Sequence, residues 1–136
     1  MNALKFILIL LQFLIVSKAK AAPAVSSPVC VIKGLIKKIE KREVDYKPES
    51  WRKSWNLPKS REYVDVTIAV STAKGLEGKA PQCDSLVGLK KFQLRDTTVK
   101  ISTSQCIVSQ TQFSGDEFAL GQWIFKIKEL KKESCR

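Results

Sequence analysis

The chain has 136 residues, with 24 basic and 13 acidic side chains, a net charge of +11 and no histidine. This composition excludes Ser-His-Asp and Cys-His catalysis, histidine-ligated zinc and the usual general base near neutral pH. The positive charge favours polyanionic partners such as nucleic acid, anionic lipid or acidic polysaccharide, and it is equally compatible with a role in solubility alone.

Residues 1–21 have the pattern of a secretory signal peptide. Lys5 precedes an apolar run that is too short for the about 20 residues needed to span a bilayer, and the small-x-small sequence AKA follows at 19–21. We expect cleavage after this site, export to the periplasm or the medium, and no transmembrane segment in the mature chain. The alternative is an uncleaved anchor held by Lys18 and Lys20.

Export would leave a single domain with one core. Residues 22–29, rich in proline, serine and alanine, predict a flexible lead, so the ordered domain spans 30–136. Three of the 24 basic residues lie in the signal peptide, which leaves 21 against 13 acidic ones and a net charge of +8. The mature chain therefore stays strongly basic.

The four cysteines all lie in the exported part: Cys30, Cys83, Cys106 and Cys135. An even number in an oxidising compartment predicts two disulfides, and the spacing contains no CxxC pair of the kind that structural zinc sites use. We therefore expect no metal. Three pairings are open, of which we favour Cys30 with Cys135, clipping the ends of the domain, and Cys83 with Cys106, tying a loop to a strand.

Segment 31–42 allows two interpretations. Its apolar residues recur at helical spacing, which would make a basic amphipathic helix. Its β-branched residues and Gly34 instead suit a curved strand with a bulge. We prefer the strand and keep the helix as the alternative.

Segment 62–70 is the clearest strand of the chain. Four branched apolar residues stand at every second position; these four are Val64, Val66, Ile68 and Val70. Asp65 falls on the opposite face, where we expect a solvated carboxylate paired with a lysine of the neighbouring strand. The glycine-rich segment 74–89 then predicts a long connection, with one short helical turn at 84–89.

The C-terminal half predicts further strands. They are expected at 90–96, 99–103, 105–113 and 121–130. A hairpin turn at 114–116 precedes the last one, which we expect to be half-buried with Trp123, Phe125 and Ile127 on one face.

These elements indicate a mainly β fold, a small antiparallel barrel of five or six strands. A long glycine-bearing first strand, a long first connection and a strong second strand resemble the OB fold over about residues 30–130. The segment after Leu94 has no room for the helix that many OB folds carry there. The alternatives are a β-sandwich, although its Cys…Trp…Cys spacing is missing, and an α+β fold with a helix at 31–42.

Residues 46–61, YKPESWRKSWNLPKSR, hold two tryptophans, five basic residues and one acid. Prolines on both sides predict a loop with one helical turn, which would make Trp51 and Trp55 neighbours. In an OB fold this connection borders the ligand face, so the resemblance implies aromatic stacking and charge attraction there. The competing interpretation, favoured by the large apolar area of two indoles, is a plug over the open end of the barrel.

The candidate contacts for an anionic ligand lie in this loop and in the basic segment before it. They are Trp51, Arg52, Lys53, Trp55, Lys59 and Arg61, with Lys37, Lys38, Lys41 and Arg42 as an extension of the same surface. The sequence KGLEGK lacks the spacing of a phosphate-binding loop, and Asp116 and Glu117 are adjacent, which suits a turn better than acid–base catalysis. We expect no enzyme and no cofactor, but an exported basic module that binds an anionic ligand; the alternative is a secreted or envelope protein-interaction module or inhibitor.

Overall fold

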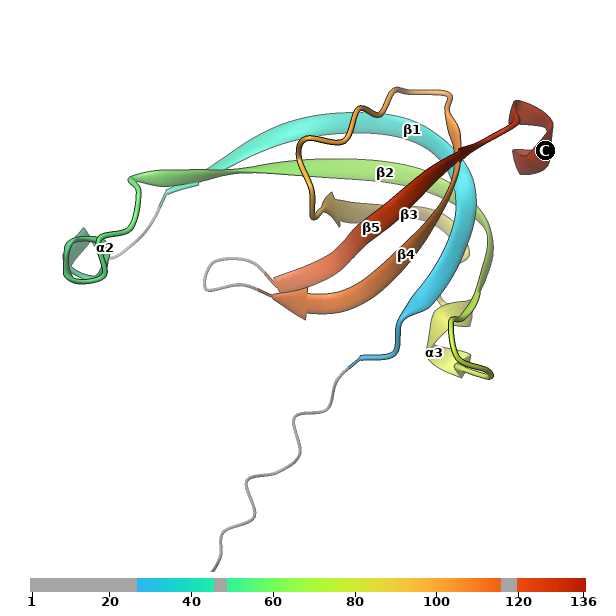
Figure 1. Ribbon diagram of the computed structural model, residues 1–136, viewed down its shortest axis with the longest axis horizontal. Helices are drawn as coiled ribbons and strands as arrows, with labels where there is room; N and C mark the ends of the chain where they lie inside the picture. Colours follow the sequence, from blue (N-terminus) through green and yellow to red (C-terminus); the bar gives the residue numbers. More distant parts are fainter. Residues whose placement is uncertain (1–26, 46–48, 116–119) are drawn as a thin grey trace, which may run out of the picture.

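The computed structural model describes residues 27–45, 49–115 and 120–136 and is mainly β (Figure 1). Residues 1–21, predicted to be a signal peptide, and most of the predicted lead, together with Asp116 and Glu117, lie outside the described residues. The elements in chain order are β1 (Cys30–Asp45), α2 (Glu49–Ser54), β2 (Ser60–Gly75), α3 (Pro81–Asp84), β3 (Gly88–Leu94), β4 (Cys106–Gly115), β5 (Leu120–Leu130) and the 3₁₀ helix η1 (Lys132–Cys135).

The five strands form one sheet that closes into a ring in the order β1-β2-β3-β5-β4, with β4 returning to β1. All pairs are antiparallel except β3 with β5, which pair in parallel through Gln93 and Leu94. The prediction of a small, mainly β, barrel-like fold is confirmed, and the sandwich and α+β alternatives are wrong. Segment 99–103 is not a strand but part of the connection from β3 to β4.

β1 is a strand whose apolar residues imitate a helical period, because Gly34 has no side chain and a bulge follows Ile36. Its inward residues are Ile32, Gly34, Ile36 and Ile39, and a bulge after Ile36 moves the next inward residue by three positions rather than two. The apolar side chains on this face therefore stand four and then three residues apart, since Gly34 has none. The helical spacing seen in the sequence comes from a curved strand.

β5 contains a third irregularity, which corrects the expected facing of its residues. Lys126 has a φ of 51°, and the register against β4 shifts beside it. Ile124 and Ile127 consequently face the core, three residues apart, while Trp123 and Phe125 lie on the opposite side. The prediction that Trp123, Phe125 and Ile127 share a face is wrong because of this bulge.

The core fills the inside of the ring with aliphatic residues and one phenylalanine. It consists of Ile32, Ile36, Val64, Val66, Ile68, Val70, Phe92, Leu94, Ile107 and Ile124. The four inward residues expected on β2 are all among them. Burial of aliphatic side chains of this size contributes about 1.5–3 kcal/mol each, so the ring is the main source of stability.

Two disulfides form, as predicted, but the favoured pairing is wrong. The bonds join Cys30 to Cys83 and Cys106 to Cys135. Cys30 pairs with Gly75 at the end of β2, so the connection that follows β2 brings α3 and Cys83 beside it. Cys106 likewise pairs with Leu130 at the end of β5, which places η1 next to it. Antiparallel neighbours, and not the ends of the domain, decide which cysteines meet.

The ends of β1 and β2 that adjoin α2 extend beyond the ring as a two-stranded arm (Figure 1). Here the arm means Arg42–Asp45, Ser60–Tyr63 and the helix α2 that ends it. β3 pairs with β2 only over 65–70, and β4 pairs with β1 only over 30–35, so neither reaches these residues. The helical turn expected at 49–55 is present as α2, whereas the turn expected at 84–89 begins earlier, as α3.

Replacing Gly34 with alanine should destabilise the ring by about 2 kcal/mol, because inserting a methyl group into a packed site forces backbone shifts. A Cβ at this position would lie 2.5 Å from the carbonyl oxygen of Ala69 and 2.9 Å from the Cα of Val70. Urea denaturation followed by circular dichroism measures the free energy of unfolding.

The matched control is Gly121→Ala in β5. Its Cβ would lie 2.7 Å from the side-chain nitrogen of Gln93, and that amide can rotate away. A loss below about 1 kcal/mol is expected. Equal losses for the two variants would contradict the close approach of β1 and β2 at Gly34.

Candidate functional site

The side of β1, β2, β3 and β5 that faces away from the core carries a continuous set of polar and aromatic residues. Directly paired residues in a sheet point to the same side, and the register joins Glu40 to Asp65 and Asp65 to Gln93. We call this the outer face. Its members are Lys38, Glu40, Arg42, Arg61, Tyr63, Asp65, Lys91, Gln93, Arg95, Gly121, Trp123 and Phe125.

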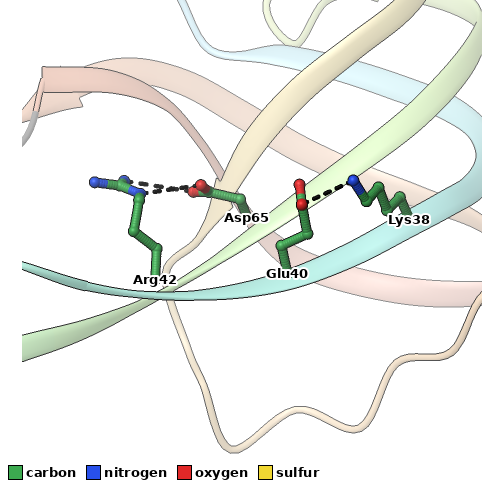
Figure 2. Close-up of polar contacts among 4 residues, drawn as sticks. All are labelled: Lys38, Glu40, Arg42 and Asp65. Carbon is green, nitrogen blue, oxygen red and sulfur yellow. Dashed lines mark hydrogen bonds and ion pairs between the residues drawn. The ribbon is translucent and has the colours of Figure 1, made fainter.

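An ion pair between Arg42 and Asp65 lies at the centre of this face (Figure 2). Arg42 donates from Nε to Oδ2 at 3.1 Å and from Nη2 to Oδ1 at 3.5 Å. The Asp65 side chain is only 9% exposed, and that of Arg42 is 42% exposed. The expectation of a solvated Asp65 paired with a lysine is wrong, because β1 presents an arginine that covers the carboxylate.

Aromatic rings hold the arginines of the outer face in place. Tyr63 is buried, and the guanidinium carbons of Arg42 and Arg61 lie 5.1 and 5.6 Å from its ring centroid. Trp123 packs against Tyr63 with ring centroids 5.9 Å apart. Such cation–π contacts restrict the movement of each guanidinium group.

The outer end of β3 repeats this arrangement. Arg95 lies over the ring of Phe125, with its guanidinium carbon 4.3 Å from the centroid. The Trp123 indole donates from Nε1 to the carbonyl oxygen of Ser114 at 2.9 Å, which fixes the ring between β4 and β5. A third guanidinium is therefore oriented by the sheet itself.

Two open depressions lie on this face. The larger, about 350 Å³, is lined by Arg42, Asp65, Lys91, Gln93, Gly121 and Gln122. The smaller, about 170 Å³, is lined by Arg61, Arg95, Ser114, Gly115 and Trp123. We call the larger one the Asp65 depression. Within the described residues, the buried side-chain oxygen of Gln93 has no hydrogen-bond partner, which is unusual for a buried polar atom.

A second ion pair, exposed to solvent, joins Lys38 to Glu40 (Figure 2). The Lys38 Nζ lies 2.8 Å from Oε1 of Glu40. This hydrogen bond, followed by the positive charges of Lys38 and Lys91, lowers the pKa of Glu40 below its ordinary value. Glu40 therefore stays ionised on the face and offsets part of its positive charge.

The two tryptophans of the first connection lie at the tip of the arm, away from the ring (Figure 1). Trp51 and Trp55 are 67% and 76% exposed, and the Trp55 N–H donates to the Trp51 carbonyl at 3.0 Å, so they are neighbours on one turn. The plug interpretation is wrong, because the arm carries the indoles beyond the barrel opening. Arg52 and Lys53 both contact Glu49, at 3.3 and 3.4 Å.

The structure divides the candidate contacts into two groups. Trp51, Arg52, Lys53 and Trp55 stay together at the tip, and Arg61 lies on the outer face with Lys38 and Arg42. Lys59, between the two groups, is exposed. Lys41 pairs with Val64 and contacts Glu62 at 3.8 Å, so it lies on the side of the sheet opposite the outer face. Lys37 occupies the bulge in β1.

Sequence reasoning missed Asp65, Lys91, Gln93 and Arg95 as members of one site. Their alternation was visible, but the neighbour of each strand was not, because the ring order decides which faces join.

Within residues 27–45, 49–115 and 120–136, His, Cys, Asp and Glu nowhere gather in threes that could hold a metal ion. The helices of that part are too short or too polar to cross a bilayer.

Replacing Lys38 with glutamine should raise the pKa of Glu40 toward its ordinary value, since both the hydrogen bond and the nearest charge are lost. In the unchanged protein the lowered pKa stabilises the fold above the pKa of the unfolded chain, and that contribution is lost as the pH falls through the lowered value. Carbon-13 NMR titration of the Glu40 carboxyl measures the shift.

Lys41→Gln serves as the control for this titration, because it removes the same charge from the opposite side of the arm. Glu40 should titrate as before in that variant. A Glu40 pKa that is the same with and without Lys38 would contradict the ion pair.

No protein-family model, no curated protein and no solved structure matches this chain. Its function is therefore inferred from the residues of the outer face and of the arm tip.

Proposed function

We propose that the protein is an exported, non-enzymatic module that binds an extended polyanion along the outer face and at the tip of the arm. The observation that carries the proposal is the charge of this face. Among the described residues named above it presents five cationic side chains against two acidic ones; they are Lys38, Arg42, Arg61, Lys91 and Arg95 against Glu40 and Asp65. A face of one dominant sign raises the local concentration of an oppositely charged chain.

The arginines support the proposal further through their orientation. Planar guanidinium groups bind phosphate, sulfate and carboxylate in a bidentate manner. Arg42 and Arg61 lie over Tyr63, and Arg95 lies over Phe125, so aromatic contacts limit the movement of all three. Less side-chain entropy is then lost when an anion binds.

The arm tip contributes mainly through its rings. Glu49 offsets part of the charge of Arg52 and Lys53, whereas Trp51 and Trp55 remain largely exposed. Indoles stack on bases and on sugar rings, and each stacked base contributes about 1–3 kcal/mol. A polyanion that leaves the outer face along the arm would meet this aromatic pair.

Export is part of the same proposal. The two disulfides support it, because such bonds form and persist in oxidising compartments. The apolar run in residues 1–21 supplies the signal, and periplasm or outside medium is the expected destination.

A second candidate function, a protein-interaction module or inhibitor, is favoured by the outer end of the β4–β5 hairpin. Phe113 and Leu120 are 47% and 71% exposed there. Exposed apolar side chains close together mark protein contacts more often than polyanion contacts. This function predicts one discrete protein partner and no response to polyanions.

Binding of a single-stranded oligonucleotide or heparin should weaken steeply with salt, since each displaced counterion contributes to the slope. Lys91→Gln with Arg95→Gln should reduce the slope of log affinity against log salt by roughly 1.4, at about 0.7 per phosphate contact. The control, Lys79→Gln with Lys132→Gln, removes equal charge from exposed positions outside the outer face and should leave the slope nearly unchanged. Fluorescence anisotropy over a sodium chloride series measures both.

Trp51→Ala with Trp55→Ala should weaken oligonucleotide binding about tenfold or more at constant slope, because stacking and not charge is lost. Phe113→Ala with Leu120→Ala is the matched apolar control and should leave polyanion binding unchanged. Binding that is absent, or that does not depend on salt, would rule out the polyanion function and favour the protein-interaction module.

A further inference from the structure

The Asp65 depression contains hydrogen-bond acceptors that a general polyanion site does not need. Its cations, Arg42 and Lys91, stand beside the carboxylate of Asp65 and the amide of Gln93. A phosphodiester chain offers mainly acceptor oxygens, and a fixed carboxylate repels it. A ligand that fits this depression must therefore carry hydrogen-bond donors as well as negative charge.

Asp65 has acceptor capacity left after its ion pair. Two ionised carboxylate oxygens provide about four acceptor positions, and the Arg42 guanidinium uses one on each oxygen. Hydroxyl groups of a sugar can donate to the remaining positions without any charge repulsion. Deoxyribose in a nucleic-acid strand has no free hydroxyl to offer.

The amide of Gln93 adds a further acceptor to the same depression. The side-chain oxygen of Gln93 is buried and has no partner within the described residues. Its amide packs over Gly121, where the absence of a side chain leaves it space to turn. Rotation toward a ligand hydroxyl would satisfy that oxygen.

On the basis of the proposed function, we infer that the Asp65 depression binds one sugar unit of an acidic polysaccharide, a polyuronate. Hydroxyl groups of the sugar donate to Asp65 and Gln93, while its carboxylate lies toward Lys91 and the free N–H groups of Arg42. A volume of about 350 Å³ is at the lower end of ligand pockets and suits a single ring. The rest of the chain follows the cationic outer face.

The test compares a hexameric oligogalacturonate with a deoxyoligonucleotide of equal charge, by isothermal titration calorimetry at one salt concentration. At least tenfold tighter binding of the oligouronate is expected. Asp65→Asn should weaken oligouronate binding about tenfold and leave oligonucleotide binding equal or tighter, since a repelling charge is removed. Glu62→Gln, on the opposite side of the arm, makes the same change in net charge and should not alter the preference.

A measurement on the unchanged protein covers the case in which Asp65→Asn does not fold. The side-chain NH₂ resonances of Gln93 should shift in a nitrogen-15 correlation spectrum when oligouronate is added, and stay in place with the oligonucleotide. Equal affinities without these shifts would overturn the uronate site and leave the polyanion function standing. Failure to bind either chain would overturn both.

Discussion

The close approach of β1 and β2 at Gly34 is the constraint on which the rest of the structure depends. A side chain there would meet the backbone of Ala69 and Val70, so only glycine lets the two strands cross this near. Register shifts between β1 and β2 lie on either side of Gly34. The first part of β1 also pairs with β4, and this pairing closes the ring. β1 and β2 are longer than the ring requires, and their excess becomes the arm that carries the two indoles.

How much of the fold can be read from the sequence follows from how regular each strand is. Over residues 63–70 β2 alternates without interruption, and its four inward residues are identified without structure. β1 and β5 contain bulges, and each bulge shifts the facing by one residue, so Ile39 and Ile127 stand at spacings that alternation does not predict. The disulfide pairing fails for a related reason, since it depends on which strand ends lie side by side.

The candidate site could be predicted only in part. The cluster of tryptophan and arginine in the first connection is local in sequence, so its helical turn and the neighbouring indoles are foreseeable. The outer face is not local, because Arg42, Asp65, Lys91 and Trp123 come from four strands. An acid between the apolar residues of an alternating strand is the one signal that the sequence contains, and both its burial and its arginine partner appear only with the register of β1 and β2.

The buried acid at the centre of a basic face decides what kind of anion the face can select. Two like charges 4 Å apart repel by about 4 kcal/mol at the effective dielectric constant typical of a protein surface. A phosphate over Asp65 would meet that repulsion, whereas a sugar hydroxyl would gain a hydrogen bond to a charged acceptor, about 1.5–3 kcal/mol. In the proposed site, Lys38, Arg61, Lys91 and Arg95 would attract any polyanion, and Asp65, held by Arg42, would favour one whose units combine hydroxyl groups with negative charge.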